Sequence, residues 1–317
     1  MNGIVNIYKE AGFTSFDVVA KMRGILKIKK IGHTGTLDPD AVGVLPVCVG
    51  NATKLVEILS EHEKEYIATM RLGVETDTQD MSGQVLNTAK VLVTEGEVRS
   101  VVSSFVGEYD QIPPMYSALK VNGKKLYELA REGKSIERKA RKVEFKEIEI
   151  ISMELPIVKL RVTCSKGTYI RTLCHDIGMK LGCFGAMEHL IRTRVDEFTL
   201  DNAITLTELE RLRNEEQLDK IFAKVDSFFM DLKGIILSDR YIKALENGNT
   251  IPLKFIIEEI DKTVENNTIE EIDKTVEIGK LKNGEQIRVY GENGKFYGVY
   301  EFYKGEEIFK PYKLFLH

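Results

Sequence analysis

The residues best suited to chemistry lie in the stretch Gly32-His33-Thr34-Gly35-Thr36-Leu37-Asp38-Pro39. Its two glycines permit backbone conformations that are closed to other residues, and Pro39 favours an extended conformation at Asp38. We expect a stiff, irregular loop that presents a carboxylate and an imidazole, with the apolar residues 42–49 packed behind it. Asp38 is then a candidate nucleophile or base. The alternative is an ordinary turn in which Asp38 caps a neighbouring amide, as is common in loops of this composition.

Other kinds of site fit the sequence less well. A phosphate-binding loop needs the pattern G-x-x-x-x-G-K-[ST], which the sequence does not contain. His175 and Asp176 resemble a fragment of a metal-dependent phosphohydrolase, but the other ligands are missing, which favours a helix-surface pair. The five histidines are scattered, and we expect no metal site. The four cysteines lack C-x-x-C spacing, which predicts buried, reduced thiols in a cytosolic protein: Cys48, Cys164, Cys174 and Cys183.

The bulk composition is that of an ordinary globular protein. The chain has 317 residues, of which 43% are hydrophobic and 30% charged, and this length allows about two domains. No apolar run approaches the ~20 residues that a membrane helix needs. The N-terminal residues lack the basic region and apolar core of a signal peptide. These features predict a cytoplasmic protein without a membrane segment.

Charge is distributed unevenly along the chain. The net charge is −4, but residues 253–279 contain eight acidic and three basic residues, which leaves the remainder close to neutral. Residues 120–142 contain nine basic and three acidic residues. Because local fields decide the attraction to phosphates, this stretch is a candidate RNA contact, and the alternative is a solvated helix face with ion pairs. The candidate phosphate contacts are Lys120, Lys124, Lys125, Arg131, Arg138, Lys139, Arg141 and Lys142.

The elements expected before and after the loop can position it. Residues 3–8 are predicted to form a strand, and Thr14-Ser15-Phe16-Asp17 is typical of a capping box that opens a helix. A short helix is expected near residues 52–59. Residues 64–72 alternate, which predicts a half-buried strand with Tyr66 near its start. The residues expected to face inward from the first helix are Val18, Val19, Met22, Ile25 and Leu26.

A second strand and helix are expected to bring further polar residues to the loop. Residues 157–164 alternate as a strand, and a helix is predicted from residue 168 to about Gly182. This arrangement places Tyr169 and Arg171 at one rim of the sheet. The fork geometry of Arg171 suits a buried carboxylate, although spacing alone does not identify its partner.

The remaining elements complete the outline. A capping box at residues 94–97 predicts a helix that ends near residue 106, and Asn122-Gly123 predicts a hairpin followed by a helix over 126–130. The character of the chain changes around residues 231–238. The turn at 247–249 and the strands expected at 235–237, 286–290 and 295–302 indicate a small β domain.

An exact eight-residue repeat lies within this last region. Residues 258–265 recur as residues 270–277, at an offset of twelve. Two copies are too few for a solenoid, so we interpret them as a tandem duplication that forms an acidic, exposed insertion over about 256–278. Its negative charge should repel phosphates, and we expect it to face away from bound RNA.

The motifs together resemble one known family. Residues 32–39, continued through residues 43–54, resemble the active-site segment of the bacterial tRNA pseudouridine-55 synthases, the TruB family. The resemblance covers nearly the whole chain, and its departures are Glu10 for the usual Pro, and Asp40 and Val42 for the common Leu and Thr. Its further blocks are Lys64-Glu65-Tyr66, Leu72-Gly73-x-x-Thr76-Asp77-Thr78-x-Asp80, Pro113-Pro114-Met115-Tyr116-Ser117-Ala118-Leu119-Lys120, Lys166-Gly167-Thr168-Tyr169-Ile170-Arg171 and Leu190-Ile191-Arg192-Thr193.

The resemblance implies an α+β architecture in two domains. Residues 1–232 are expected to form a catalytic domain with a mixed, largely antiparallel sheet flanked by helices. Within it, residues 114–142 form the basic insertion that closes over the tRNA arm. Residues 233–317 are expected to form a small β-barrel similar to the PUA RNA-binding domain, with the acidic insertion inside it.

The resemblance also implies the reaction, which is isomerisation of uridine 55 in the tRNA T loop. The bond from the sugar C1′ to uracil N1 breaks, and C1′ joins C5 instead. Because atoms are conserved and no redox step occurs, we expect neither a metal nor an organic cofactor. The implied nucleophile or base is Asp38, held ionised by Arg171.

The flipped-out base needs a pocket, and the resemblance supplies its residues. Tyr66 is expected to stack on the uracil and to supply or take a proton, while Tyr169 and Leu190 wall the pocket. His33 is expected to occupy the gap in the tRNA or to contact the displaced nucleotides. The supporting network is expected to contain Asp80 and Lys54.

The implied partner is the T-arm and loop of tRNA, bound by a monomer without an obligatory protein partner. A tRNA-folding chaperone with incidental or lost catalysis is the second hypothesis, and the intact Asp38, Tyr66 and Arg171 argue against loss. A guide-RNA-dependent enzyme of archaeal or eukaryotic particles is a third, although its Lys/Arg-rich extensions are absent. A nucleotide-phosphate-binding enzyme is the weakest hypothesis.

Overall fold

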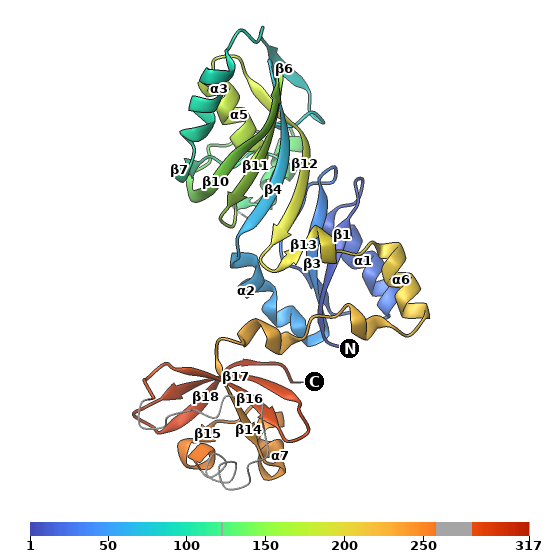
Figure 1. The fold of residues 1–317 in the computed structure, drawn as a ribbon, viewed down its shortest axis with the longest axis vertical. Coiled ribbons are helices and arrows are strands. Elements are labelled where there is room, and N and C mark those ends of the chain that lie inside the picture. The colour runs from blue at the N-terminus through green and yellow to red at the C-terminus, as the bar shows by residue number, and fades with distance from the viewer. Residues whose placement is uncertain (122, 258–280, 317) are drawn as a thin grey trace.

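The computed structural model describes residues 1–121, 123–257 and 281–316. Figure 1 shows a long, twisted sheet with helices against it and a smaller curled sheet at the other end of the molecule. Both copies of the repeat lie outside the described residues, as does most of the expected acidic insertion. The orientation expected for that insertion therefore stays a prediction.

The large sheet has nine strands, and its main path follows the order β1-β3-β12-β4-β11-β10-β7. β12 runs parallel to β3, whereas every other pairing described in this sheet is antiparallel. The expected mixed, largely antiparallel sheet is thus confirmed. Its strands are β1 (Gly3–Lys9), β2 (Ile31–His33), β3 (Val42–Val49), β4 (Lys64–Leu72), β7 (Gly107–Gln111), β10 (Arg141–Glu154), β11 (Ile157–Cys164), β12 (Gly185–Val195) and β13 (Phe198–Thr199).

The pattern of burial along β4 and β3 follows from their places in the sheet. β4 lies between β12 and β11, and its residues alternate between buried and half-buried from Lys64 to Leu72, as predicted. β3 lies between β1 and β12 and is buried at every position after Val42. The apolar residues 42–49 therefore form an inner strand of the sheet, and the loop of Asp38 leads directly into this strand.

The first helix has the cap that its sequence predicts. α1 (Ser15–Leu26) begins with a capping box, in which Thr14 Oγ1 accepts from the Asp17 amide at 3.1 Å and Asp17 Oδ2 accepts from the Thr14 amide at 2.8 Å. Its buried apolar residues pack with those of α6 (Leu206–Asn214). Ile25 and Leu26 are only partly buried, because they lie at the end of the helix.

The other helices are short, and Figure 1 shows α3 and α5 against the large sheet. α5 begins at residue 170 rather than 168 and ends before Gly182, while α3 ends three residues before the expected 106. None of the helices in the described ranges is long and apolar enough to cross a membrane. The helices besides α1 and α6 are η1 (Gly50–Leu55), α2 (Val56–Glu61), α3 (Glu95–Ser103), α4 (Leu126–Arg131), α5 (Ile170–Lys180), η2 (Leu200–Asn202), η3 (Leu218–Lys220), η4 (Val225–Phe229), η5 (Asp239–Tyr241) and α7 (Ile242–Glu246).

The smaller sheet has five strands in the order β14-β16-β17-β18-β15 and curls around its own apolar core. The strands predicted at 235–237, 286–290 and 295–302 are confirmed to within two residues. The curled form agrees with the expected PUA-like domain. Its strands are β14 (Lys233–Leu237), β15 (Ile251–Pro252), β16 (Gln286–Gly291), β17 (Phe296–Tyr303) and β18 (Ile308–Leu314).

Aromatic rings join the two parts of the molecule. Phe229 lies 6.1 Å from Phe296 and 6.0 Å from Phe315, measured between ring centroids. Phe315 belongs to the same apolar cluster as Ile4 of β1. The smaller sheet is therefore attached at the end of the large sheet that lies away from the loop of Asp38.

α5 approaches β12 so closely that only glycine fits between them. A methyl group on Gly178 would lie 2.1 Å from the backbone nitrogen of Gly185. Gly24 of α1 is also a helix-interior glycine, but a methyl group there meets nothing within 4 Å. Both glycines lie inside a helix, but Gly178 faces the backbone of a neighbouring strand and Gly24 faces open space.

We therefore predict opposite effects of the same substitution at these two positions. Gly178→Ala should lower the free energy of unfolding by about 1–3 kcal/mol, because the backbones of α5 and β12 must separate. Gly24→Ala should raise it by about 0.5–1 kcal/mol, because alanine favours the helix. Urea unfolding followed by circular dichroism measures both. Equal effects at the two positions would contradict the close packing.

Candidate active site

The loop that carries Asp38 connects β2 to β3 and is anchored from several sides. The Leu37 amide donates to Ser15 Oγ at 2.9 Å, and the Pro39 carbonyl accepts from the Gly12 amide at 3.0 Å. The Ala41 amide donates to the Asp38 carbonyl at 3.2 Å and closes a turn. These contacts agree with the predicted irregular, well-anchored loop. The turn uses the backbone of Asp38 and leaves its carboxylate free for other contacts.

Lys9 is a further anchor that sequence reasoning missed. Its side chain is fully buried at the end of β1, and Nζ donates to the carbonyls of Pro39 at 2.9 Å and Glu10 at 3.1 Å. Burial lowers its pKa to about 8, while Asp38 and Asp40 oppose that change. A lone lysine at a strand end gives no signal in the sequence, because its burial depends on the loop that folds over it.

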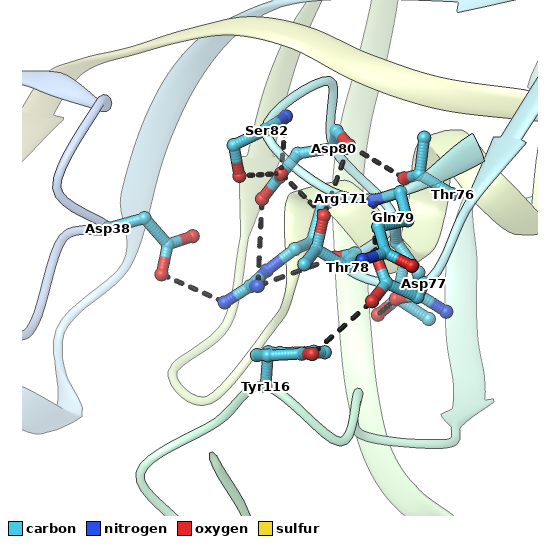
Figure 2. A network of polar contacts seen from close by, with 11 residues as sticks. Asp38, Thr76, Asp77, Thr78, Gln79, Asp80, Ser82, Tyr116 and Arg171 are labelled. Atoms are coloured by element: carbon cyan, nitrogen blue, oxygen red, sulfur yellow. Dashed lines mark hydrogen bonds and ion pairs between the residues drawn. The ribbon is translucent and has the colours of Figure 1, made fainter. Parts of the chain in front are cut away.

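Arg171 pairs with Asp38, as the family resemblance implies. Its Nη2 donates to Asp38 Oδ1 at 2.8 Å, and its side chain is only 7% exposed, against 34% for Asp38 (Figure 2). Burial raises the pKa of Asp38, and the Arg171 guanidinium opposes this rise. A carboxylate with a raised pKa is a stronger base and nucleophile than a free one once it is ionised.

Asp80 completes the network around Arg171 from the turn between β5 (Val74–Thr76) and β6 (Val85–Thr88). Arg171 Nη1 lies 3.7 Å from Asp80 Oδ2 and donates to the Thr78 carbonyl at 3.4 Å. Asp80 Oδ1 is held by Thr78 Oγ1 at 2.7 Å and by the Ser82 amide at 3.0 Å (Figure 2). The expected position of Asp80 in this network is confirmed.

Tyr66 and Leu190 lie together on the neighbouring strands β4 and β12. Both are buried in the apolar cluster that also contains Leu37 and Ala41 of the loop. Burial raises the pKa of Tyr66, with Asp38 also contributing and Arg192 opposing. The hydroxyl is therefore protonated at neutral pH and can donate a hydrogen bond.

Arg192 is a second residue that sequence reasoning missed. It pairs with Tyr66 across β12 and β4 and is 1% exposed. Its Nε donates to the Val44 carbonyl at 2.7 Å and its Nη2 to the Gly35 carbonyl at 3.2 Å. The sequence signal that could have pointed to Arg192 was its place in the block Leu190-Ile191-Arg192-Thr193. Arg192 ties the loop to the strands beneath Tyr66.

Tyr169 and His33 lie at the edges of this group. Tyr169 is the N-cap residue of α5, and its amide donates to Gln111 Oε1 at 2.8 Å. Burial raises its pKa, and Asp38 and Arg171 are among its charged neighbours. His33 ends β2, and its Nδ1 accepts from the Gly35 amide at 3.3 Å. Burial and Arg192 lower the pKa of His33, so its imidazole is neutral at physiological pH.

Lys54 does not lie where it was expected. It belongs to η1, at the opposite end of β3 from the loop, and its Nζ donates to the Leu314 carbonyl of β18 at 2.6 Å. Because β3 spans eight residues, roughly 25 Å separates its two ends. Lys54 therefore cannot join the network of Arg171. Burial and the neighbouring Lys30 and Lys313 lower its pKa.

The basic segment forms a small hairpin, a helix and an extended stretch. β8 (Lys120–Val121) pairs with β9 (Lys124–Lys125), which is followed by α4, as the turn signal predicts. Lys124 lies 3.4 Å from Glu132, and Lys142 lies 3.5 Å from Glu108. Within the described ranges, the other six candidate phosphate contacts form no ion pair. Six of the eight are exposed, and Lys125 and Arg138 are half-buried.

The structure also locates the cysteines and histidines. All four cysteines are buried and free of disulfides, as predicted. His175 bridges two carboxylates at the surface of α5, so the expected helix-surface pair has a third member. In residues 1–121, 123–257 and 281–316, no group of three His, Cys, Asp or Glu side chains is arranged to hold a metal ion.

Comparison with known proteins agrees with this site. Residues 23–170 match the family described as TruB family pseudouridylate synthase, N-terminal domain, and residues 171–230 match the tRNA pseudouridylate synthase B C-terminal domain. The chain is 50% identical to tRNA pseudouridine synthase B of Lachnoclostridium phytofermentans over the whole of both chains. It is 45% identical to that of Clostridium novyi, with coverage of 94% of this chain and 95% of the relative.

Solved structures show the same fold at lower identity. A Cbf5-Nop10-Gar1 complex contains a chain with a TM-score of 0.67 and 26% identity, and an H/ACA RNP bound to a substrate RNA containing 2′-deoxyuridine contains one with 0.66 and 24%. Each similarity covers 99% of this chain and 85% of the other. The length and identity of these matches lead to one conclusion: the chain belongs to the TruB family of pseudouridylate synthases.

Proposed function

We propose that the chain isomerises uridine 55 in the T loop of tRNA to pseudouridine, with Asp38 as the nucleophile or base. The observation that supports this role best is the 2.8 Å contact between Asp38 and the buried Arg171, next to the apolar cluster of Tyr66 and Leu190. A carboxylate at that place can reach a base that is received by the cluster. The relatives named tRNA pseudouridine synthase B support tRNA as the substrate.

The chemistry requires one ionised carboxylate near the sugar. The C1′–N1 bond breaks and a C1′–C5 bond forms, the proton of C5 passes to solvent, and N1 gains a proton, so the product is an isomer. Asp38 starts this exchange either by attack on C1′ or by removal of a sugar proton. Arg171 keeps the carboxylate ionised, and Asp80 holds the guanidinium in place.

The base must leave its stack in the tRNA before it can reach Asp38. We propose that Tyr66 stacks on the uracil, and its protonated hydroxyl is placed to supply a proton. Tyr169 and Leu190 wall the pocket, and the neutral imidazole of His33 contacts the displaced nucleotides or fills the gap. Tyr66 and Leu190 lie on the strands β4 and β12, Tyr169 is the N-cap of α5, and His33 ends β2, which leads into the loop.

Two basic regions are suited to hold the RNA backbone. The first is the segment of residues 120–142, in which six of the eight candidate phosphate contacts are exposed. The second is the junction cluster of Lys30, Lys54 and Lys313, in which Lys30 and Lys313 lower the pKa of Lys54. Within the described residues, none of these three forms an ion pair. Like charges held close together without carboxylate partners attract phosphates.

The remaining expectations concern organisation. We propose a catalytic domain over residues 1–232 and a PUA-like RNA-binding domain over 233–317, because the two sheets draw their strands from these separate ranges. A monomer acting in the cytoplasm, where tRNA is abundant, needs no guide RNA or protein partner. The identities of 45% and 50% to tRNA enzymes, against 24% and 26% to the ribonucleoprotein chains, support a stand-alone enzyme.

The first prediction concerns Asp38. Wild-type protein should release tritium from tRNA that carries 5-tritiated uridine, because the C5 hydrogen leaves only when C5 becomes the new attachment point. Asp38→Asn should lower the rate by at least about a thousandfold while tRNA binding is retained. Asp40→Asn, in the same loop, is the matched control and should keep most activity. Tight binding without release by the wild type would favour the folding-chaperone hypothesis.

The second prediction concerns the basic segment. The triple variant Lys120→Gln, Lys139→Gln, Arg141→Gln should weaken binding of whole tRNA and of an isolated T-arm hairpin alike. Each lost phosphate contact should reduce the salt dependence of log K by about 0.7–0.9. Filter binding over a range of salt concentrations measures both quantities. The double variant Lys90→Gln, Lys180→Gln, at exposed positions before α3 and at the end of α5, is the control.

The third prediction concerns the junction cluster. Because it lies roughly 25 Å from the loop, the double variant Lys54→Gln, Lys313→Gln should weaken binding of whole tRNA but leave the T-arm hairpin unaffected. The expected loss is on the order of tenfold at low salt. An equal loss for both RNAs would place the contact in the T arm itself. No loss for either would remove the cluster from RNA binding.

A further inference from the structure

α5 contacts the β5–β6 hairpin through residues on one face of the helix. Arg171 reaches Thr78 and Asp80, and Thr172 Oγ1 donates to Gln79 Oε1 at 2.7 Å. One turn after Arg171, His175 Nε2 lies 3.3 Å from Glu75 Oε1 in β5. The tip of the hairpin is thus held by Arg171, and its base by His175.

The hydrogen-bond geometry indicates the charge state of His175. Its Nδ1 lies 3.0 Å from Asp176 Oδ1, while Nε2 faces Glu75. Ionised carboxylates accept hydrogen bonds and do not donate them, so both contacts are hydrogen bonds at once when both ring nitrogens carry a proton. The second oxygens of the two carboxylates are occupied as well, by Asn87 Nδ2 at 2.7 Å and Tyr109 Oη at 2.8 Å. With both carboxylates ionised, the imidazolium is the form of His175 that fits this arrangement.

The hairpin depends on such contacts for its position. β5 and β6 form a sheet of two strands, and all four residues of β6 are exposed. An isolated two-stranded hairpin is marginally stable in water. Backbone hydrogen bonds of 3.0 Å join its turn to Met187 of β12. At its base the Gly73 amide donates to the Phe184 carbonyl at 3.2 Å, and Glu75 adds the side-chain contact to His175 of α5. A shift of the base would move Asp80 relative to Arg171.

We propose that His175, as an imidazolium bridging Glu75 and Asp176, is a positioning residue that holds the hairpin so that Asp80 keeps Arg171 aligned with Asp38. This inference rests on the proposed role of Asp38 and Arg171 in the reaction. The polar contacts that place His175 are those to Glu75 and Asp176, so it acts through Glu75 and the hairpin.

The bridge is sensitive to pH in one direction. The groups that face His175 are Glu75 of β5 and Asp176 of α5, with Tyr109 of β7 behind Asp176. Asp176 and Glu75 raise the pKa of His175 above 6.5, and burial partly opposes them. A raised pKa means that the cation is present at and below the ordinary value and is lost as pH rises through the folded-state value. The contribution of the bridge is therefore lost on the alkaline side.

The test compares His175→Gln with His62→Gln. His62 also forms a contact with a carboxylate, at 2.6 Å to Asp196, but it lies away from the hairpin and serves as the matched control. Single-turnover tritium release should be about fivefold to tenfold slower in His175→Gln at about pH 6, with tRNA affinity unchanged. As pH is raised towards about 9 the two rates should converge, because the bridge loses its charge on the alkaline side. His62→Gln should match the wild type at both pH values.

A charge-swapped pair supplies a second, independent measurement. His175→Asp alone places three carboxylates together and should be slow, whereas Glu75→Arg combined with His175→Asp restores an ion pair whose cation does not titrate. The double variant should approach the wild-type rate at about pH 6 and exceed it at about pH 9. Thermal unfolding of each variant confirms that the compared proteins are folded.

Several outcomes would overturn the inference. These are a wild-type rate for His175→Gln at both pH values, the same loss at both, or no rescue by the charge swap. The last two would assign His175 to stability alone. If the wild type itself releases no tritium, the proposed function fails instead, so the two failures are distinguishable.

Discussion

The ion pair between Asp38 and Arg171 is the contact on which the site depends. Charges that are largely removed from water are stable only when their partners are held in good geometry. Each side of this pair is fixed by backbone contacts. The loop of Asp38 is anchored by Lys9 and Ser15, and α5 is pressed against β12 where Gly178 meets Gly185. The packing of the sheet and helices therefore determines the distance between two side chains that are far apart in the sequence.

Two cations face the carboxylates of the site. Arg171 contacts Asp38 and Asp80, and the buried Lys9 is attracted by Asp38 and Asp40. This attraction opposes the cost of burying the Lys9 ammonium, which also holds the loop through the Pro39 carbonyl. Burial raises the pKa of Asp38, so its carboxylate is more basic than a free one, and the contact with Arg171 orients it. Both properties are needed by a nucleophile or base at neutral pH.

The candidate active site and the exposed cations lie in different parts of the molecule. Asp38 lies next to a mostly apolar cluster that contains Tyr66, whereas the exposed cations lie in the segment of residues 120–142 and in the junction cluster. The net charge of −4 therefore says little about RNA binding. Because screened interactions act over about 8–10 Å at physiological salt, each cationic surface acts on the phosphates next to it.

The sequence by itself determined the local elements and pointed to Asp38 as the candidate carboxylate. The alternation of β4, the capping box of α1 and the hairpin of β8 and β9 depend on short-range chemistry, and each is found where it was predicted. The long family resemblance then identified Asp38, Arg171 and Asp80 as partners.

Only the tertiary structure decided which side chains share an environment. Lys54 lies in a matching motif, yet the length of β3 carries it to the opposite end of the sheet. Lys9 and Arg192 gave no individual signal, because their burial results from a loop and a strand that close over them. The bridge of His175 to Glu75 likewise joins residues a hundred positions apart, and only the packing of α5 against the hairpin brings them together.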